Sequence, residues 1–195
     1  MSLKERVYSV LVVSSSQKLN TALSALLEKP RFSPVVFASD LSTAKRDIAD
    51  RAFDFLLVNS PLPEDSGIRL AVDTASSGET AVLLLVPGEF AEDIHDKTAE
   101  YGVFTLGKPT AKPMLLTALS WMESMRERMR KAEKKATSIE EKMQEIRLVN
   151  RAKWLLISEE GMDEETAHHD IERQAMDRCI TKRQIAEEII RRYQT

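Results

Sequence analysis

One uninterrupted helical pattern organises this chain: residues 113–157 read PMLLTALSWMESMRERMRKAEKKATSIEEKMQEIRLVNRAKWLLI. Apolar residues recur every 3.5 positions on average, and no Gly or Pro follows the initial Pro113. This repeat predicts a single long helix whose apolar stripe forms the seam of a two-stranded coiled coil. The seam residues that carry this prediction are Met122, Met125, Met129, Ile139, Met143 and Ile146.

Charged residues beside the seam agree with this interpretation. Arg128 and Lys135 stand five residues before Glu133 and Glu140, which is the spacing of opposite charges across two parallel helices. We therefore expect a homodimer formed through a connector helix between two domains. The alternative is a solitary surface helix that packs on its own domain.

Composition limits the remaining possibilities. With 195 residues, the chain has room for one ordinary domain and a smaller one. Its net charge of −3 gives no general attraction to nucleic acid or anionic membrane, so such binding would need local basic patches. The single cysteine, Cys179, excludes an intramolecular disulfide and a multi-cysteine metal site. We expect a cytoplasmic protein without a metal or a cofactor. No apolar run is long enough to span a bilayer, so we also expect no membrane partner.

Five short apolar runs alternate with helical patterns in the first half of the chain. The expected strands are Val7–Val13, Pro34–Ala38, Phe53–Val58, Ala81–Val86 and Val103–Leu106. The expected helices between them are Gln17–Leu27, Leu41–Ala52, Ile68–Ala75 and Ala91–Tyr101. Because the strand runs are nearly continuous in apolar character, we expect both faces of a parallel sheet to be covered. The alternation predicts a doubly wound α/β domain, with ligand chemistry beyond the carboxyl ends of the strands.

Residues at those strand ends resemble the receiver domain of bacterial response regulators, over about Val7 to Leu119. The matching features are Lys108-Pro109 after the last strand and Pro63 and Gly67 after the third. The resemblance implies a flavodoxin-like fold. It also implies an acidic pair that binds Mg²⁺, an Asp that accepts phosphate, and a Ser or Thr after the fourth strand.

This sequence departs from the receiver pattern at the reactive positions. Ser14 and Ser15 replace the acidic pair, Asn59 replaces the phosphoacceptor, and Val86 replaces the hydroxyl residue. Two serines offer only neutral hydroxyls to Mg²⁺, and an Asn amide is a poor nucleophile. Asp54 and Asp65 are near Asn59 in sequence, but neither is placed to substitute for it. We expect Ser14, Ser15, Asn59 and Lys108 to form a degenerate pocket that is not phosphorylated by the usual route.

The chain after the connector is helical throughout. Gly161 is expected to end the long helix in the left-handed conformation. Asp163 is expected to cap a second helix, and Thr181 with Gln184 forms a capping box at the start of a third. These signals predict a small three-helix bundle.

This bundle resembles the ANTAR domain, an RNA-binding module at the C-terminus of certain bacterial transcription antiterminators. The resemblance covers about Glu145 to Arg191 and rests on Ala152–Leu156, Gly161-Met162, Ala175-Met176 and Ile185-Ala186. Members of the family usually carry Gly where Trp154 stands.

Polar residues at the ends of two helices are the candidates for RNA contact. They are Arg147, Asn150, Arg151, Lys153, Lys182 and Arg183. Lys and Arg meet phosphates in nucleic-acid complexes, and Trp154 or Tyr193 could stack on a base or belong to the core. Asn150 and Lys153 occupy seam positions, so we expect either that the paired helices separate before them or that the seam gives way to another surface.

Together these features predict an α/β plus all-α protein, with a pseudo-receiver at 1–112, a coiled-coil connector at 113–145 and an ANTAR-type domain at 146–195. The expected function is RNA-binding transcription antitermination, not enzyme catalysis. The expected partners are hairpins in nascent mRNA, a second copy of the chain, and a ligand-responsive regulatory protein on the pseudo-receiver. The alternatives are a DNA-binding response regulator and a protein-interaction adaptor.

Overall fold

The computed structural model describes residues 6–28 and 30–193 and divides the chain into two compact units, Met1–Lys131 and Ala132–Thr195. The first five and last two residues of the predicted domains lie outside the described residues. The first unit extends beyond the predicted boundary at residue 112, because it includes the first part of the long helix.

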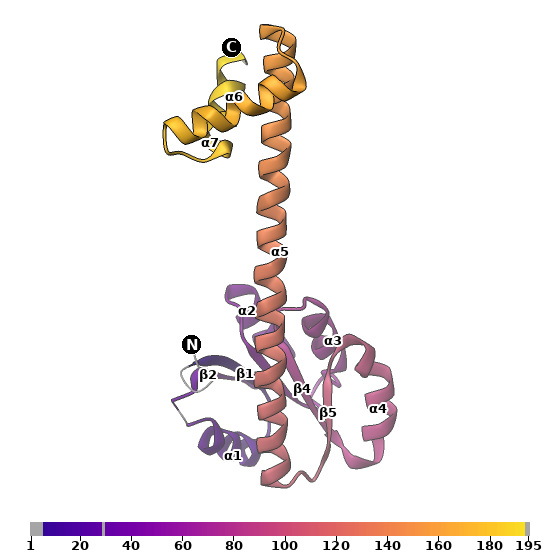
Figure 1. Cartoon of the computed structure of the whole chain (residues 1–195). Coiled ribbons are helices and arrows are strands. Elements are labelled where there is room, and N and C mark those ends of the chain that lie inside the picture. The colour runs from indigo at the N-terminus through magenta and orange to yellow at the C-terminus, as the bar shows by residue number, and fades with distance from the viewer. Residues whose placement is uncertain (1–5, 29, 194–195) are drawn as a thin grey trace. The chain divides into compact units, whose positions relative to one another are not determined.

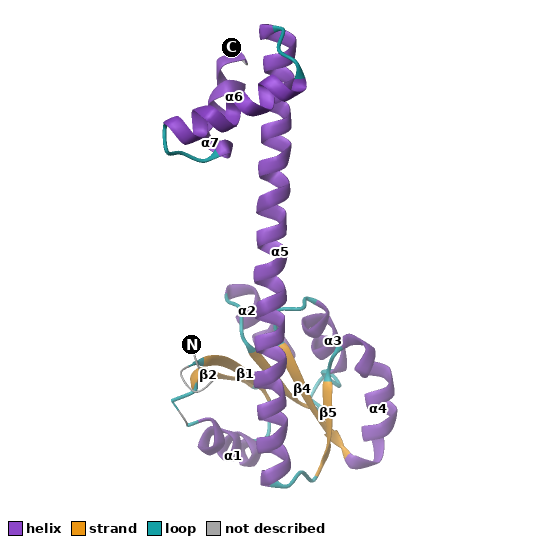
Figure 2. Ribbon diagram, viewed as in Figure 1, coloured by secondary structure: helices purple, strands orange, loops and turns teal. Residues whose placement is uncertain are grey.

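The first unit contains a five-stranded parallel sheet with the strand order β2-β1-β3-β4-β5 (Figure 1). The strands are β1 Tyr8–Val13, β2 Phe32–Ala38, β3 Phe55–Asn59, β4 Ala81–Pro87 and β5 Phe104–Lys108. The helices are α1 Gln17–Leu27, α2 Leu41–Asp50, α3 Ile68–Ser76, α4 Ala91–Thr98 and the long α5 Lys112–Glu160. Two 3₁₀ turns, η2 Gly88–Phe90 and η3 Ala99–Tyr101, flank α4. Figure 2 shows the strands of the sheet in orange and the helices in purple. The doubly wound, receiver-type fold is confirmed.

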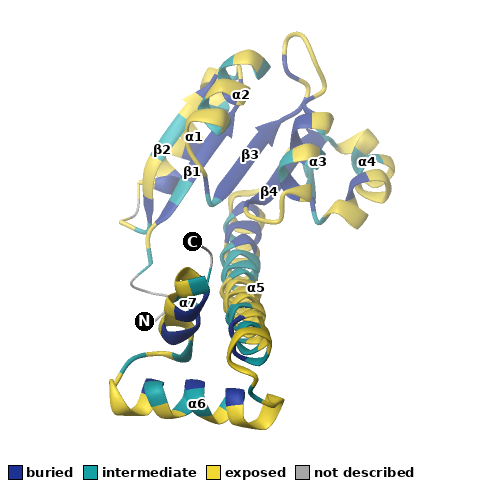
Figure 3. Ribbon diagram, turned by 90° about the horizontal axis from the view of Figure 1, so that it is seen from above, coloured by how far each residue is buried: buried dark blue, intermediate teal, exposed yellow. Residues whose placement is uncertain are grey.

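The two faces of this sheet bury alternate residues of each strand. One face, with residues such as Val10, Phe55 and Leu83, is covered by α1 and the start of α5. The other face, with residues such as Leu11, Leu56 and Leu84, is covered by α2, α3 and α4. Figure 3 shows the buried central strands between helices whose outer surfaces are exposed. The apolar character of the strand runs is therefore explained by burial on both sides.

Element ends differ from the predictions by a few residues. β3 begins at Phe55, whereas the prediction began this strand at Phe53; the Asp54 side chain accepts from the Ser9 backbone N–H. β5 continues to Lys108, which pairs with Pro87 of β4. The helix expected at Ala91–Tyr101 ends as an α-helix at Thr98 and continues as η3.

The start of α5 belongs to the core of the first unit. Leu115, Ala118, Leu119 and Met122 are buried against the sheet, with the i, i+3, i+4, i+7 spacing of one helix face. The prediction that Met122 is a dimer seam residue is therefore wrong for this position, since its side chain is fully buried within its own domain. For this part of the helix, the alternative of packing on its own domain is correct.

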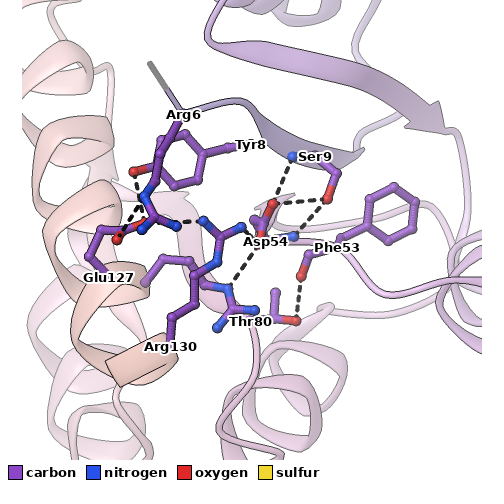
Figure 4. A network of polar contacts seen from close by, with 9 residues as sticks. Arg6, Tyr8, Ser9, Phe53, Asp54, Thr80, Glu127 and Arg130 are labelled. Atoms are coloured by element: carbon purple, nitrogen blue, oxygen red, sulfur yellow. Dashed lines mark hydrogen bonds and ion pairs between the residues drawn. The ribbon is translucent and has the colours of Figure 1, made fainter. Parts of the chain in front are cut away.

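Beyond Met122, two arginines of α5 bind Asp54 at the amino edge of the sheet (Figure 4). Arg126 Nε lies 2.9 Å and Arg130 Nη2 lies 2.7 Å from Asp54 Oδ1. The backbone N–H of Ser9 in β1 donates to Asp54 Oδ2 at 3.0 Å. The Asp54 side chain is only 12% exposed, so its charge needs these partners.

The pKa of Asp54 is lower than that of an ordinary aspartate. Burial acts to raise its pKa, but the Ser9 hydrogen bond, the Arg126 hydrogen bond and the charges of Arg130 and Arg126 outweigh burial. The ionised carboxylate is thus the form that the folded first unit stabilises.

A second carboxylate extends the network on the same face of α5. Glu127 accepts from Arg6 Nε at 3.1 Å, from Arg130 Nη1 at 3.1 Å and from the Tyr8 hydroxyl at 3.3 Å. The Tyr8 ring stacks on Phe55 with centroids 4.9 Å apart, so the network joins directly to the apolar core. We call Asp54, Glu127, Arg126 and Arg130 the Asp54 cluster.

The second unit is a three-helix bundle made of the end of α5, α6 Glu164–Asp177 and α7 Lys182–Tyr193. Its core residues are Ala152, Leu156, Ala167, Ile171, Ala175, Ile185, Ala186, Ile189 and Ile190. The predicted helix ends are confirmed: Gly161 has φ 69°, and Asp163 Oδ1 accepts from the Thr166 N–H at 2.7 Å. Thr181 and Gln184 exchange backbone-to-side-chain hydrogen bonds as a capping box.

None of the helices that the structure describes is both long enough and apolar enough to cross a membrane.

Replacing Asp54 by Asn should lower the free energy of unfolding by about 2–3 kcal/mol, because it leaves two arginines without their buried counter-charge. Urea denaturation followed by circular dichroism measures this loss. The matched control is Asp73→Asn, which removes an aspartate from the exposed Arg69–Asp73 pair and should cost under about 0.5 kcal/mol. Because folding lowers the pKa of Asp54, its contribution is complete at neutral pH and is lost as pH falls below about 4. If the difference in unfolding free energy between the wild type and Asp54→Asn stays the same below about pH 4, the ionised Asp54 is not its source.

Candidate functional site

Three predicted pocket residues meet at the carboxyl edge of the sheet. Ser14 follows β1, while Asn59 and Lys108 are the last residues of β3 and β5. Lys108 Nζ donates to Asn59 Oδ1 at 2.7 Å and to the Ser60 carbonyl at 2.5 Å. Asn59 Nδ2 in turn donates to Ser14 Oγ at 3.1 Å. The structure thus joins Lys108, Asn59 and Ser14 in one hydrogen-bonded chain.

Neutral groups accept the two hydrogen bonds that Lys108 donates. Burial lowers the pKa of its ammonium group. Ser14 and Asn59 are buried, and Ser14 Oγ also accepts from the Ser16 N–H at 3.2 Å. The fourth predicted residue, Ser15, is exposed and takes no part in these contacts.

The two carboxylates nearest to Asn59 in sequence are used elsewhere. Asp54 lies at the opposite edge of the sheet in the Asp54 cluster. Asp65 accepts from the Gly67 N–H at 2.6 Å and so holds its own loop. Gly67 has φ 73°, and a Cβ there would lie 2.7 Å from Val58 Cγ1, so this turn requires glycine. Val86 is fully buried in the core and brings no polar group to the pocket.

The predicted RNA-binding residues separate into two groups. Asn150, Lys153 and Lys182 line one hollow of about 390 Å³, together with Lys142, Glu145, Ile146, Val149 and His168. Arg147 and Arg151 are exposed on α5 but do not line this hollow. Arg183, at the start of α7, is also exposed and also lies outside it.

Ion pairs within the second unit hold three of the predicted cations. Lys153 Nζ lies 3.0 Å from Glu164, Lys182 pairs with Glu172, and Arg183 Nε lies 2.9 Å from Glu187. Sequence reasoning missed these acidic partners. The Arg183–Glu187 pair has the i, i+4 spacing that could have revealed it, whereas Lys153–Glu164 and Lys182–Glu172 join different helices.

Arg147 and Arg151 differ from those cations, because within the described residues neither forms an ion pair. Trp154, on the same part of α5, is 70% exposed. Tyr193 instead packs against the bundle core and donates a hydrogen bond to Glu160.

The remaining seam residues become more exposed along α5. Met125 and Met129 are half-buried in the first unit. Ile139, Met143 and Ile146, in the second unit, are about half exposed or more. These three large apolar side chains are left uncovered by the single chain.

Comparison with known proteins agrees with both halves of this description. Residues 137–190 match the ANTAR domain model. The transcriptional regulatory protein PdtaR of Mycobacterium tuberculosis (strain H37Rv) is 25% identical over 182 residues, covering 93% of this chain and 88% of the relative.

Solved structures give the same fold. A signal receiver domain of an HD domain-containing protein from Pseudomonas fluorescens Pf-5 is 25% identical, with a TM-score of 0.57 over 65% of this chain and 93% of that domain. The response regulator StyR has a TM-score of 0.65 at 18% identity, over 95% of this chain and 98% of StyR. The chain therefore carries a receiver-like domain followed by an ANTAR domain.

Proposed function

We propose that this chain, in which an ANTAR domain follows a receiver-like domain, is an RNA-binding regulator of transcription antitermination. It acts as a homodimer on hairpins in nascent mRNA, and its receiver-like domain works without aspartyl phosphorylation. The match of residues 137–190 to the ANTAR domain carries the RNA-binding part of this proposal. The Lys108–Asn59–Ser14 chain of hydrogen bonds carries the phosphorylation-independent part.

The pocket chemistry supports a receiver that is not phosphorylated by the usual route. Mg²⁺ prefers hard, anionic oxygen ligands. Ser14 offers a neutral hydroxyl that already accepts two hydrogen bonds, and the neutral hydroxyl of Ser15 belongs to an exposed residue. The amide of Asn59 is a poor nucleophile, and its oxygen is bound to Lys108. These residues do not fit Mg²⁺, so the regulatory input takes another form.

Two inputs are compatible with this pocket. Either a ligand-responsive regulatory protein binds the receiver-like domain, or the dimer forms constitutively. In neither case does regulation depend on a covalent change at Asn59.

The dimer seam that we propose runs from Met125 to Ile146, without Met122. Its exposed apolar residues Ile139, Met143 and Ile146 would be covered by the same residues of a second chain. Lys135 and Glu140 are both exposed beside this stripe, with the spacing for an ion pair between parallel helices.

The structure of α7 favours RNA over the alternative of a DNA-reading helix. Glu187 and Glu188 stand midway along α7 and pair with Arg183 and Arg178, so the exposed cations beside them are already neutralised. Such a helix would bring carboxylates to the phosphates of a DNA groove. The adaptor alternative predicts binding to neither nucleic acid.

Filter binding separates these three functions. The full-length, unphosphorylated chain should bind RNA hairpins and show weaker binding to duplex DNA of matched length. RNA affinity should fall steadily with salt concentration, because phosphate contacts release counterions. Equal affinity for both polymers would favour the DNA-binding alternative, and no binding to either would favour the adaptor.

Incubation with acetyl phosphate and Mg²⁺ should leave the mass of the wild-type chain unchanged. The control is a variant that combines Ser14→Asp, Ser15→Asp and Asn59→Asp, which restores the anionic groups and should gain the mass of one phosphoryl group. Intact-mass spectrometry reads both results. A stable phosphoryl adduct on the wild-type receiver-like domain would overturn this part of the proposal.

Charges placed in the seam should dissociate the dimer. The pair Met143→Lys and Ile146→Lys should raise the dimer dissociation constant at least about tenfold, because two apolar side chains lose their burial. The control pair, Ser138→Lys and Gln144→Lys, adds the same charge at exposed positions of α5 that lie off the seam. Sedimentation equilibrium measures both pairs. If both double variants have the same dimer dissociation constant, the seam is not the dimer interface.

A further inference from the structure

Trp154 is the most exposed aromatic side chain of the second unit among the residues that the structure describes. It is 70% exposed, although the bundle core contains apolar residues immediately around it in sequence, such as Ala152 and Leu156. A large aromatic side chain left in solvent beside a closed core is available to stack on a ligand.

Two arginines share the helix face of Trp154. Arg147 precedes it by seven residues and Arg151 by three, which places all three side chains on one side of a helix with 3.6 residues per turn. Both arginines are exposed, and within the described residues neither has an acidic partner. They are therefore available to an anionic ligand, unlike Lys153, Lys182 and Arg183.

Two carboxylates of this part of α5, Glu145 and Glu160, lie toward α7. Glu145 lines the hollow that Lys182 of α7 also lines. Glu160 accepts from Tyr193 and lies 3.7 Å from Arg192 Nη1, both of α7. The face that carries Trp154 thus combines an aromatic surface with uncompensated positive charge.

A second copy of the chain fits this face less well than RNA does. In the seam register, Trp154 and Arg147 occupy e positions, which meet g positions of a parallel partner. Those g positions are Lys142 and Val149: Lys142 would bring a like charge opposite Arg147, and Val149 packs against its own bundle core. The nearby seam positions are the polar Asn150 and Lys153, so the apolar seam ends at Ile146.

We propose that Trp154 stacks on an unpaired base in the loop of an RNA hairpin, while Arg147 and Arg151 contact the neighbouring phosphates. This proposal rests on the proposed RNA-binding function and names the part of the RNA that this face reads. Unpaired bases in RNA loops are commonly bound by aromatic stacking, and every base offers a face for it. The adjacent guanidinium groups supply the charge that a flanking phosphate requires.

The test uses RNA hairpins selected in vitro on the full-length wild-type chain, from a pool with a constant stem and a randomised loop. Trp154→Ala should weaken binding about tenfold or more, as expected for the loss of one stacked base. Trp154→Phe keeps an aromatic face and should retain most of the affinity. The matched control is Trp121→Ala, which removes an exposed tryptophan from the first unit and should leave RNA affinity unchanged.

Abasic substitutions along the loop locate the base. At one loop position, an abasic substitution should weaken RNA binding by the wild type as strongly as Trp154→Ala does. The same substitution should not weaken RNA binding by the Trp154→Ala variant any further. Circular dichroism of each variant confirms that the helices are intact.

The outcomes distinguish this inference from the function on which it rests. If selection yields no RNA that binds the wild type, the proposed function fails and the inference fails with it. If the wild type and Trp154→Ala bind the selected hairpin equally, the inference alone is overturned. It is also overturned if Trp154→Ala dissociates the protein dimer and a covalently linked dimer of the variant regains full affinity.

Discussion

The Asp54 cluster fixes the long helix to the sheet, and the rest of the first unit depends on this contact. Asp54 holds two arginines of α5 while its other oxygen accepts the backbone N–H of Ser9 in β1. Leu115 to Met122 bury the preceding turns of the same helix in the core. Apolar packing and a partly buried set of charges therefore act on consecutive turns of α5, so this part of the helix has one defined position on the sheet.

The cluster lies at the amino edge of the sheet, opposite the chain of Lys108, Asn59 and Ser14 at the carboxyl edge. Two of the strands that lead to this pocket, β1 and β3, begin near Ser9 and Asp54. At the carboxyl edge, hydrogen bonds join the Lys108 ammonium to neutral groups, while at the amino edge ion pairs hold α5. This distribution suits the proposed dimer, in which the first unit positions α5 for association with a second chain.

The architecture was predictable from sequence because apolar runs and capping residues are local signals. The order of polar residues at strand ends also located the pocket, since the carboxyl ends of parallel strands meet at one edge. The seam was only partly predictable. A helix face that packs on its own sheet and a face that packs on a second chain require the same apolar repeat, so Met122 and Met143 look alike in sequence. The structure separates them by burial.

The charges of the proposed RNA-binding region were also only partly predictable from the sequence. Lys182 and Arg147 are equivalent as sequence signals, but Glu172 pairs with Lys182 across two helices and no described residue pairs with Arg147. Partners far apart in sequence decide which cations remain available. The Asp54 cluster was missed for the same reason, because Arg126 and Asp54 are far apart along the chain.

The central claim is that an unphosphorylated dimer binds RNA. Sedimentation velocity of the full-length chain with a selected hairpin RNA, in the absence of any phosphodonor, tests it most directly. The account predicts a complex that contains two protein chains. A complex with one chain, or one that forms only after treatment with acetyl phosphate, would contradict it.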